Sequence, residues 1–328
     1  MNIFIVQSPF QLLNAIEARE HLHKTDSDIL VVSFSKNING NNQINEVLKL
    51  YDWPKVIKQP MYFFTSERLL RMIYLIFFLK SKKVISNLFI GDFKPDDLWL
   101  IANNLNLNKI YLLDDGGQTL NMPWMFKNIK NINKERDKRK DIIAHFFGLK
   151  GCDRKMIGLF TMYQLPKPPN MCDVVINNFK YTKSKNENAK ENIDDIYFVG
   201  QSFISAGIIK PDEYYSYLNK IRLRYKNKNL FYLPHRKEDV FLLRQNCPNL
   251  EILKTKVPIE LYFLLKKIKP LHIASFCSTA LESLNLIYNI DNVDSFILDY
   301  KLLSVYHKKI IEDTYVYYKN KFNLIELK

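Results

Sequence analysis

Short apolar runs alternate along this chain with longer segments of helical periodicity. The short runs are typical of buried parallel strands, and the segments between them are typical of amphipathic helices. In the first half we expect strands at 1–6, 29–34, 88–92 and 110–113. We expect helices there at 10–23, 43–51, 66–80 and 95–105, and an Asn-rich loop at 36–43. This alternation predicts a parallel, doubly wound α/β sheet.

The alternation stops after residue 122 and resumes near residue 193. In the second half we expect strands at 196–199, 230–233, 250–253, 271–276 and 295–299. We expect helices at 212–225, 258–267 and 280–288, and a last helical segment toward the C-terminus. The interval between the halves is irregular, with seven Lys and Arg residues in 127–141, three prolines in 166–169 and a polar stretch at 180–192. We therefore predict a first domain at 1–180, a linker at 181–192 and a second domain at 193–328.

Composition narrows the class of protein only slightly. The 328 residues carry a formal charge of +14, which suits anionic partners without choosing among them. The four cysteines, at 152, 172, 247 and 277, have neither zinc-site nor disulfide spacing, so reduced thiols in a cytosolic protein are expected. The start of the chain does not resemble a signal peptide. The most apolar helical stretch, 69–79, contains Arg71 and is too short for a bilayer core of about 30 Å.

Two carboxylates and two glycines follow the expected strand at 110–113. Asp114 and Asp115 come at its carboxyl end, where open α/β sheets bind ligands. Adjacent side chains on an extended backbone point in opposite directions, so one aspartate should face a ligand while the other stabilises the loop. The alternative is an Asp-rich turn that accepts backbone hydrogen bonds.

Three strand ends in the second half carry polar groups suited to a phosphate. They are Gly200-Gln201-Ser202, Pro234-His235-Arg236 and Ser278-Thr279, the last at a helix start. Each group also has a structural alternative. Thr279 and Glu282 have the spacing of a capping box, His235 could take part in a surface salt bridge, and Gly200 could simply turn the chain. Glu260 lies in a first helical turn, where acidic residues are favoured in any case.

In order along the chain, these motifs resemble those of bacterial sialyltransferases. Asp114-Asp115-Gly116, Pro234-His235-Arg236 and Ser278-Thr279 are similar to the D/E-D-G, HP and S-S/T motifs of these enzymes, although the proline here precedes the histidine. Residues 3–15 are similar to the start of glycosyltransferase family 52, which includes lipooligosaccharide and capsule sialyltransferases. Pro258-Ile259-Glu260-Leu261 resembles the segment that places a glutamate on the donor ribose.

The resemblance implies a GT-B fold, with two Rossmann-like domains whose parallel sheets face a central cleft. It implies transfer of N-acetylneuraminic acid from CMP-N-acetylneuraminic acid to a galactose-terminated capsule or lipooligosaccharide glycan, with inversion and without a metal or cofactor. Asp115 would be the general base and His235 would contact the departing phosphate, a role that Arg236 could share. The implied donor-side residues are Gly200, Gln201, Ser202, Pro234, His235, Arg236, Glu260, Phe276, Ser278 and Thr279. The implied acceptor-side residues are Gln7, Ser8, Pro9, Asp114 and Gly116.

Other functions remain open from the sequence. A glycosidase would need two carboxylates that flank one bond at a separation of about 5–10 Å. The adjacent Asp114 and Asp115 are badly placed for this, so a glycosidase is disfavoured. A transferase of the same fold that uses another nucleotide sugar, such as a glucosyl donor, is the nearest alternative, and a basic nucleic-acid-binding protein is a more distant one. Our leading interpretation has no nucleic-acid partner, allows a homodimer, and places the enzyme in the cytoplasm. For the basic segment 127–140 the alternatives are a solvated surface, contact with an acidic glycan or with anionic lipid headgroups of the inner face of the cell membrane, and direct nucleic-acid binding.

Overall fold

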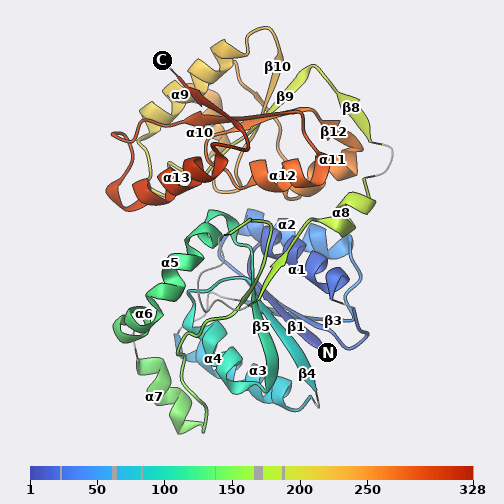
Figure 1. The fold of residues 1–328 in the computed structure, drawn as a ribbon, viewed down its shortest axis with the longest axis vertical. Coiled ribbons are helices and arrows are strands. Elements are labelled where there is room, and N and C mark those ends of the chain that lie inside the picture. Colours follow the sequence, from blue (N-terminus) through green and yellow to red (C-terminus); the bar gives the residue numbers. More distant parts are fainter. Residues whose placement is uncertain are drawn as a thin grey trace. The chain divides into compact units, whose positions relative to one another are not determined.

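The computed structural model of the chain consists of two compact α/β units. The structure describes residues 1–22, 24–60, 65–82, 84–136, 138–165, 173–186 and 189–327. The first unit is Met1–Asn177 and the second is Asn178–Lys328 (Figure 1). Each contains a sheet of parallel strands, so the predicted α/β fold class is confirmed.

The first unit is built on a seven-stranded parallel sheet in the order β3-β2-β1-β4-β5-β6-β7. Its strands are β1 (Asn2–Val6), β2 (Ile29–Phe34), β3 (Lys55–Pro60), β4 (Ile85–Ile90), β5 (Leu107–Leu113), β6 (Gly158–Thr161) and β7 (Val174–Ile176). Strand β1 pairs with β2 on one side and with β4 on the other, with Ile3 opposite both Ile29 and Leu88. The strand order therefore reverses at β1, the position where such sheets bind ligands.

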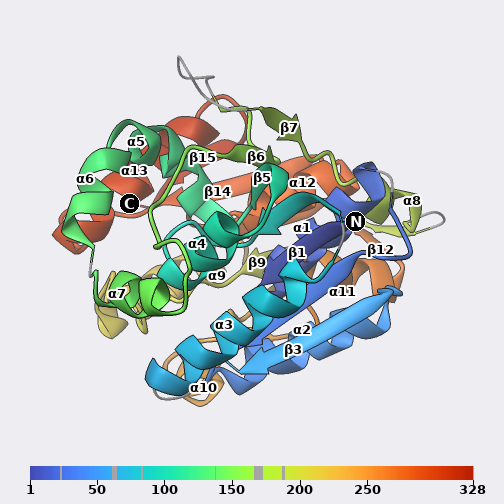
Figure 2. The same cartoon turned by 90° about the horizontal axis from the view of Figure 1, so that it is seen from below.

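Helices cover both faces of this sheet, as Figures 1 and 2 show. They are α1 (Pro9–His21), α2 (Ile38–Lys49), α3 (Thr65–Lys80), α4 (Asp96–Asn104), the 3-10 helix η1 (Gly116–Asn121), α5 (Met122–Lys127), α6 (Ile129–Glu135) and α7 (Arg139–Phe146). On one face, Ile3 and Leu88 pack with residues of α3 and α4 in the apolar core. On the other face, Phe4, Phe89 and Tyr111 stack in a row across β1, β4 and β5.

The second unit has a six-stranded parallel sheet in the order β11-β10-β9-β13-β14-β15. Its strands are β9 (Asp195–Val199), β10 (Asn229–Leu233), β11 (Glu251–Ile252), β13 (His272–Ser275), β14 (Asn292–Ile297) and β15 (Asn323–Glu326). Its helices are α8 (Lys180–Ser184), α9 (Pro211–Arg224), α10 (Val240–Asn246), α11 (Ile259–Lys266), α12 (Ala280–Tyr288) and α13 (Val305–Tyr318). A separate ladder pairs β8 (Lys190–Asn192) with β12 (Ile268–Pro270). Phe198 packs with residues of α9 on one face of this sheet. Tyr197 packs against Phe263 of α11 on the opposite face.

Several expected boundaries differ from the structure. The Asn-rich stretch predicted as a loop is largely helical, because the Asn37 side chain caps α2 by accepting a bond from the Gly40 N–H. The polar stretch predicted as a linker contains α8 and β8. Strands β3, β6, β7 and β15 were not predicted, although each extends a sheet. The proline cluster at 166–169 lies outside the described residues.

Two further expectations concern cysteines and membrane spans. Cys152, Cys247 and Cys277 are free thiols, and Cys172 lies outside the described residues. Across the part of the chain that the structure describes, the helices are all too short or too polar to cross a bilayer.

Candidate functional site

Three polar residues follow neighbouring strands at the carboxyl edge of the first sheet. Gln7 follows β1, Asp92 lies two residues after β4, and Asp115 lies two residues after β5, and these strands are adjacent in the order β1-β4-β5. All three are half-buried. This edge therefore presents two partly accessible carboxylates, of which only Asp115 was predicted from the sequence.

Asp114 stabilises the loop that follows β5. Its side chain has no exposed surface, and its Oδ2 accepts a 2.7 Å hydrogen bond from the Met162 N–H. Burial raises the pKa of Asp114 to about 6, against the lowering effect of hydrogen bonds from Thr161, Met162 and Thr119. A carboxylate enclosed in this way does not reach an acceptor, so we assign Asp114 to the loop and not to the predicted acceptor side.

Asp115 is the aspartate that remains partly accessible. It precedes η1 with φ −124° and ψ 53°, and Gly116 after it has φ 72°. Because glycine adopts left-handed backbone angles at little energetic cost, the chain can turn here directly after the strand. Asp114 is thus buried while Asp115 keeps accessible surface, which agrees with the expectation that only one of the two faces a ligand.

The predicted acceptor-side residues after β1 have different environments. Ser8 is buried and caps α1, its Oγ accepting a 3.2 Å bond from the Gln11 N–H, and Pro9 is the buried first residue of that helix. Gln11 Oε1 accepts a 2.7 Å bond from the Gln7 N–H, and a Cβ on Gly91 would lie 2.1 Å from that same oxygen. Ser8 and Pro9 therefore shape the loop, and Gln7 is the residue of this trio with accessible surface.

In the second unit, the carboxyl ends of β10, β9 and β13 are bonded to one another. The Gly200 N–H donates to the Leu233 carbonyl at 2.9 Å, which joins β9 to β10. Gln201 Oε1 accepts a 3.0 Å bond from the Cys277 N–H, which joins β9 to β13. The half-buried residues Ser202, Pro234 and Ser278 lie on these same loops. The three predicted polar strand ends therefore meet at one edge, as expected, and Gln201 serves to tie two of them together.

His235 is a neutral hydrogen-bond donor in this loop. Its Nδ1 accepts a 3.2 Å bond from the Lys237 N–H, so the proton of the neutral ring lies on Nε2. Burial, with smaller contributions from the Arg236 and Lys237 charges, lowers the pKa of His235 to about 4. The positive charge beside the loop therefore comes from Arg236 and Lys237, and the imidazole supplies a neutral N–H.

Glu238 stabilises the His235 loop through hydrogen bonds and was not predicted as a site residue. Its Oε2 accepts a 2.6 Å bond from the His235 N–H, and its Oε1 accepts bonds from the hydroxyls of Tyr232 and Tyr214 at 2.6 and 3.2 Å. A Cβ on Gly200 would lie 2.3 Å from Glu238 Oε2, so the carboxylate fits only because that residue is glycine. Burial raises the pKa of Glu238 to about 7. Its position three residues after His235 was the available signal in the sequence.

The start of α12 differs from the expected capping box. Thr279 has helical backbone angles, and it is the hydroxyl of Ser278 that accepts a 3.3 Å bond from the Ala280 N–H. Glu282 instead accepts bonds from Lys321 and Tyr317. The Ser278 carbonyl accepts a 2.8 Å bond from the Tyr318 hydroxyl, so residues of α13 fix the beginning of α12.

Two other predicted donor residues are more buried than expected. Phe276 has no exposed surface and packs among aromatic rings that include Phe198 and Phe203, so it supports the loop and cannot line a ligand site. Glu260 is 5% exposed, and its Oε1 accepts a 2.7 Å bond from Ser283 of α12. Burial raises the pKa of Glu260, whereas the hydrogen bond from Ser283 and the charge of Arg236 lower it.

Metal ligands do not gather in the described parts of either unit. Within those residues, His, Cys, Asp and Glu form no group of three or more that could bind a metal ion. The polar groups that the strand ends provide are amides, hydroxyls, an imidazole and a guanidinium, which suit an oxyanion.

Comparison with known proteins identifies the family. A model of the alpha-2,8-polysialyltransferase family matches residues 2–296, most of the chain. The chain belongs to this family. No curated protein sequence matches it. The predicted resemblance to sialyltransferases is thus confirmed at the level of the enzyme class, and this alpha-2,8-polysialyltransferase family member is a glycosyltransferase. The narrower assignment to glycosyltransferase family 52 stays a prediction.

Solved structures similar to this polysialyltransferase-family chain have the GT-B fold. The alpha/beta-galactoside alpha-2,3-sialyltransferase of Photobacterium phosphoreum is 11% identical, with 99% of this chain and 98% of that chain covered and a TM-score of 0.52. Arabidopsis thaliana UGT89C1, solved with UDP-L-rhamnose, is 8% identical, with 99% and 84% covered and a TM-score of 0.52. The glycosyltransferase VinC, solved with dTDP, is 8% identical, with 100% and 87% covered and a TM-score of 0.52. The predicted GT-B fold is confirmed.

The buried Glu238 of this sialyltransferase-family chain predicts a pH-dependent stability. A carboxyl whose pKa is higher in the folded than in the unfolded chain binds its proton more tightly when folded, so stability falls as pH rises from the ordinary value of 4.5 to about 7. Glu238→Gln should remove up to ~3 kcal/mol of this fall, because one pKa unit corresponds to about 1.4 kcal/mol. Urea unfolding of both proteins between pH 4.5 and 7.5 measures the difference.

Glu251 provides a matched control for this measurement because it is an exposed glutamate at the edge of the same sheet. Glu251→Gln should reproduce the wild-type dependence on pH. Parallel curves for wild type and Glu238→Gln would show that Glu238 does not titrate in this window.

Proposed function

We propose that the protein transfers N-acetylneuraminic acid from CMP-N-acetylneuraminic acid to a sugar hydroxyl, with inversion and without a metal ion. The glycosidic bond between C2 of the sialic acid and the CMP phosphate breaks, and the acceptor oxygen bonds to C2 from the opposite face. The acceptor proton passes to Asp115, and the electron pair of the broken bond leaves on the phosphate. CMP and the sialylated acceptor are the products.

The observation that carries this proposal is the set of cross-bonded loops at β10, β9 and β13. Negative charge grows on the phosphate as the bond breaks, and donors already fixed in place stabilise such charge best. Ser278 accepts from Ala280 through its oxygen, so its own hydroxyl proton can point to a ligand. His235 lies two strands away, roughly 10 Å along the sheet edge, which is a suitable span for one nucleotide phosphate and its sugar. Arg236 would supply the positive charge.

The remaining donor contacts in the proposal concern the ribose. Glu260 accepts from Ser283 through one carboxylate oxygen, which fixes its orientation at the start of α11. Its second oxygen would accept from a ribose hydroxyl. Gly200 and Ser202 would contribute backbone groups, whereas Gln201 and Phe276 would act by keeping these loops in place.

On the acceptor side the proposal rests on Asp115. A carboxylate can remove the proton of an incoming hydroxyl late in the reaction, when that proton has become acidic. Asp115 is half-buried at a strand end, and Asp114 is already bonded to Met162. Gln7 and Gly116 would form the neighbouring acceptor surface.

Calorimetric titration tests the donor assignment. CMP should bind in the presence of EDTA, and uridine diphosphate should bind much more weakly. A preference for uridine diphosphate would favour the alternative of a glucosyl-type donor on the same fold. Binding of CMP only after a divalent cation is added would contradict the metal-independent part of the proposal.

Two sugar termini are candidates for the acceptor. A galactose-terminated glycan follows from the sequence motifs, and a sialic acid terminus is favoured by the alpha-2,8-polysialyltransferase description of the family. NMR of the product formed on lactose and on sialyllactose distinguishes them, because the linked carbon differs. Product on lactose would support the galactose terminus, and product on sialyllactose alone would support the sialic acid terminus.

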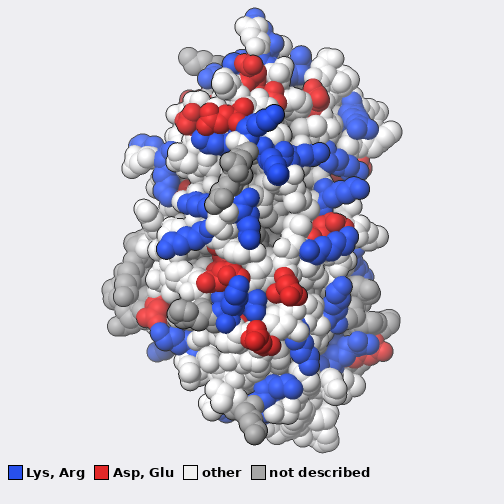
Figure 3. Space-filling model, turned by 90° about the vertical axis from the view of Figure 1, so that its right-hand side faces the viewer, with Lys and Arg blue, Asp and Glu red and all other residues white. Residues whose placement is uncertain are grey.

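A nucleic-acid-binding function is the less supported alternative. Figure 3 shows one face of the molecule, on which both Lys and Arg groups and Asp and Glu groups are exposed. Binding to oligonucleotides that weakens steeply with salt, without transfer from CMP-N-acetylneuraminic acid, would favour it over the transferase.

A further inference from the structure

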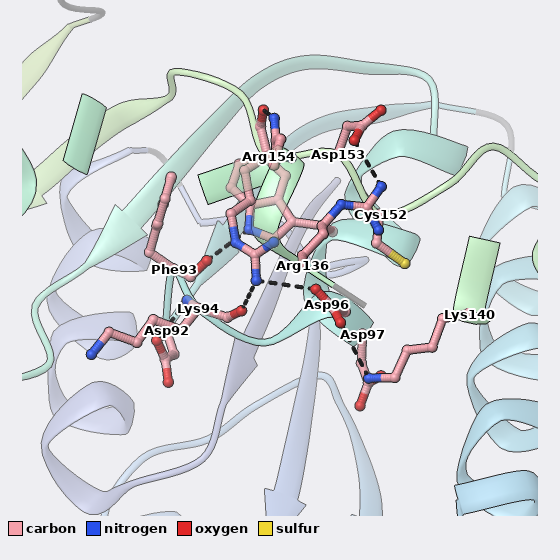
Figure 4. A network of polar contacts seen from close by, with 12 residues as sticks. Asp92, Phe93, Lys94, Asp96, Asp97, Arg136, Lys140, Cys152, Asp153 and Arg154 are labelled. Atoms are coloured by element: carbon pink, nitrogen blue, oxygen red, sulfur yellow. Dashed lines mark hydrogen bonds and ion pairs between the residues drawn. The ribbon is translucent and has the colours of Figure 1, made fainter. Parts of the chain in front are cut away.

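Helix α7 is attached to the first unit by its polar side. Arg136 donates to both carboxylate oxygens of Asp141 at 3.1 and 2.6 Å, and the Cys152 N–H donates to Asp141 Oδ1 at 2.8 Å. Lys140 Nζ lies 3.1 Å from Asp97 Oδ1 of α4, as Figure 4 shows together with the surrounding ion pairs. These contacts fix the orientation of α7 without using its large apolar side chains.

The large apolar side chains of α7 therefore project outward. At 100° per residue, Arg139, Ile142, Ile143 and Phe146 share one face, and Lys140, Asp141 and the fully buried Ala144 share the other. Ile142 is 70% exposed and Phe146 is 84% exposed. Amphipathic helices of water-soluble proteins normally have the reverse arrangement.

Helix α3 adds a second exposed apolar stripe close to α7. Leu70, Tyr74 and Phe77 recur at the spacing of one helix face, and Tyr74 is 75% exposed. Asp97 of α4 forms ion pairs with Arg68 of α3 and with Lys140 of α7, so the first turns of α3 and α7 both lie near the start of α4. Figure 2 shows α3 and α7 on the side of this unit that is turned toward the viewer. We call the exposed residues of α3 and α7 together the α3–α7 face.

Positive charge accompanies this apolar surface. Lys138 and Arg139 begin α7, and Lys80 ends α3 with its Nζ 5.8 Å from the centre of the Phe77 ring. Lys82 follows Lys80, and Glu67 is the acidic residue on the first turn of the α3 stripe. Aromatic and aliphatic side chains surrounded by lysine and arginine are typical of segments that lie in the interface of an anionic bilayer.

We propose that the α3–α7 face attaches this protein to the surface of a membrane rich in anionic lipid. Phe146, Ile142, Tyr74 and Phe77 would enter the boundary between headgroups and acyl chains, and the lysines and Arg139 would bind lipid phosphates. A second copy of the chain is a poorer occupant, because a twofold contact would bring this positive face against itself. A membrane supplies both the apolar layer and the opposite charge.

Co-sedimentation of the whole chain with lipid vesicles tests the proposal. The protein should bind vesicles that contain phosphatidylglycerol and should bind pure phosphatidylcholine much more weakly, with binding to the anionic vesicles reduced by salt. Phe146→Ser should weaken partition about tenfold, because burying one such side chain is worth at least that factor in an equilibrium constant. The combination of Phe146→Ser with Tyr74→Ser should abolish binding.

Phe241→Ser is the matched control, because Phe241 is a 75% exposed aromatic residue on α10 of the second unit. It should leave vesicle binding unchanged. CMP affinity should be the same in all these proteins, so failure of the proposed donor site would be seen separately. Equal binding to both vesicle types, or equal effects of Phe146→Ser and Phe241→Ser, would overturn the proposal. Concentration-dependent dimers that disappear in Phe146→Ser, without vesicle binding, would assign the face to a contact between copies.

Discussion

Replacing Asp115 with asparagine is expected to lower kcat by about 100- to 10,000-fold, the usual contribution of a general base. Asp115 is the aspartate of the Asp114–Asp115 pair that keeps accessible surface. Asp114 cannot replace it, because its carboxylate is enclosed and bonded to the Met162 N–H. The affinity for CMP should stay close to wild type, since Asp115 belongs to the first unit and the proposed nucleotide contacts belong to the second. Initial rates with CMP-N-acetylneuraminic acid and calorimetry with CMP measure the two quantities.

Asp92 offers a matched control for this experiment. It is a second half-buried carboxylate on the neighbouring strand end, and burial raises its pKa. Asp92→Asn should reduce kcat far less than Asp115→Asn. The reverse order of effects would move the base from the β5 loop to the β4 loop, and a fully active Asp115→Asn enzyme would reject the assignment.

His235→Ala is expected to weaken CMP binding and to lower kcat as well. The Nε2–H of a neutral imidazole can donate to a phosphate oxygen, and a hydrogen bond to a charged group is worth about 1.5–3 kcal/mol. The loss in kcat/KM should therefore be roughly 10- to 150-fold. Because the charge increases on the phosphate in the transition state, part of this loss should be seen in kcat and not only in KM.

Arg236→Gln separates the charge from the imidazole. It removes the adjacent cation but leaves the His235 loop bonded to Glu238. We expect a loss of CMP affinity that is smaller at high salt, because part of the attraction in the wild type is then screened.

For His235→Ala, kinetics equal to those of the wild type would remove His235 from the site.

The central strands and the longest helices could be predicted from the sequence. Strand β2 and helix α12 have the predicted bounds, since buried apolar runs and helical periodicity are local signals. Strand β3 was missed because Lys55, Lys58 and Gln59 interrupt its apolar pattern at the edge of the sheet. Strands β6 and β7 were missed because they are short and separated from the rest by the 3-10 helix η1 and three α-helices.

The site was only partly predictable for a similar reason. The sequence shows that polar loops follow β9, β10 and β13. The direction of each side chain in these loops depends on neighbours that are distant in the chain. Phe276 points into the aromatic core, and the role of Glu238 depends on Gly200, 38 positions earlier. Spacing along one segment cannot reveal a contact between two strands.

The C-terminal segment has a consequence for building hybrid enzymes. The family match ends at residue 296, before α13 and β15, yet the buried Tyr318 of α13 donates to the Ser278 carbonyl, and β15 completes the sheet beside β14. Exchanging second units between relatives at that point would separate Ser278 from the tyrosine that is bonded to its carbonyl. A transplanted second unit therefore needs its own residues 297–328, although the family match does not include them.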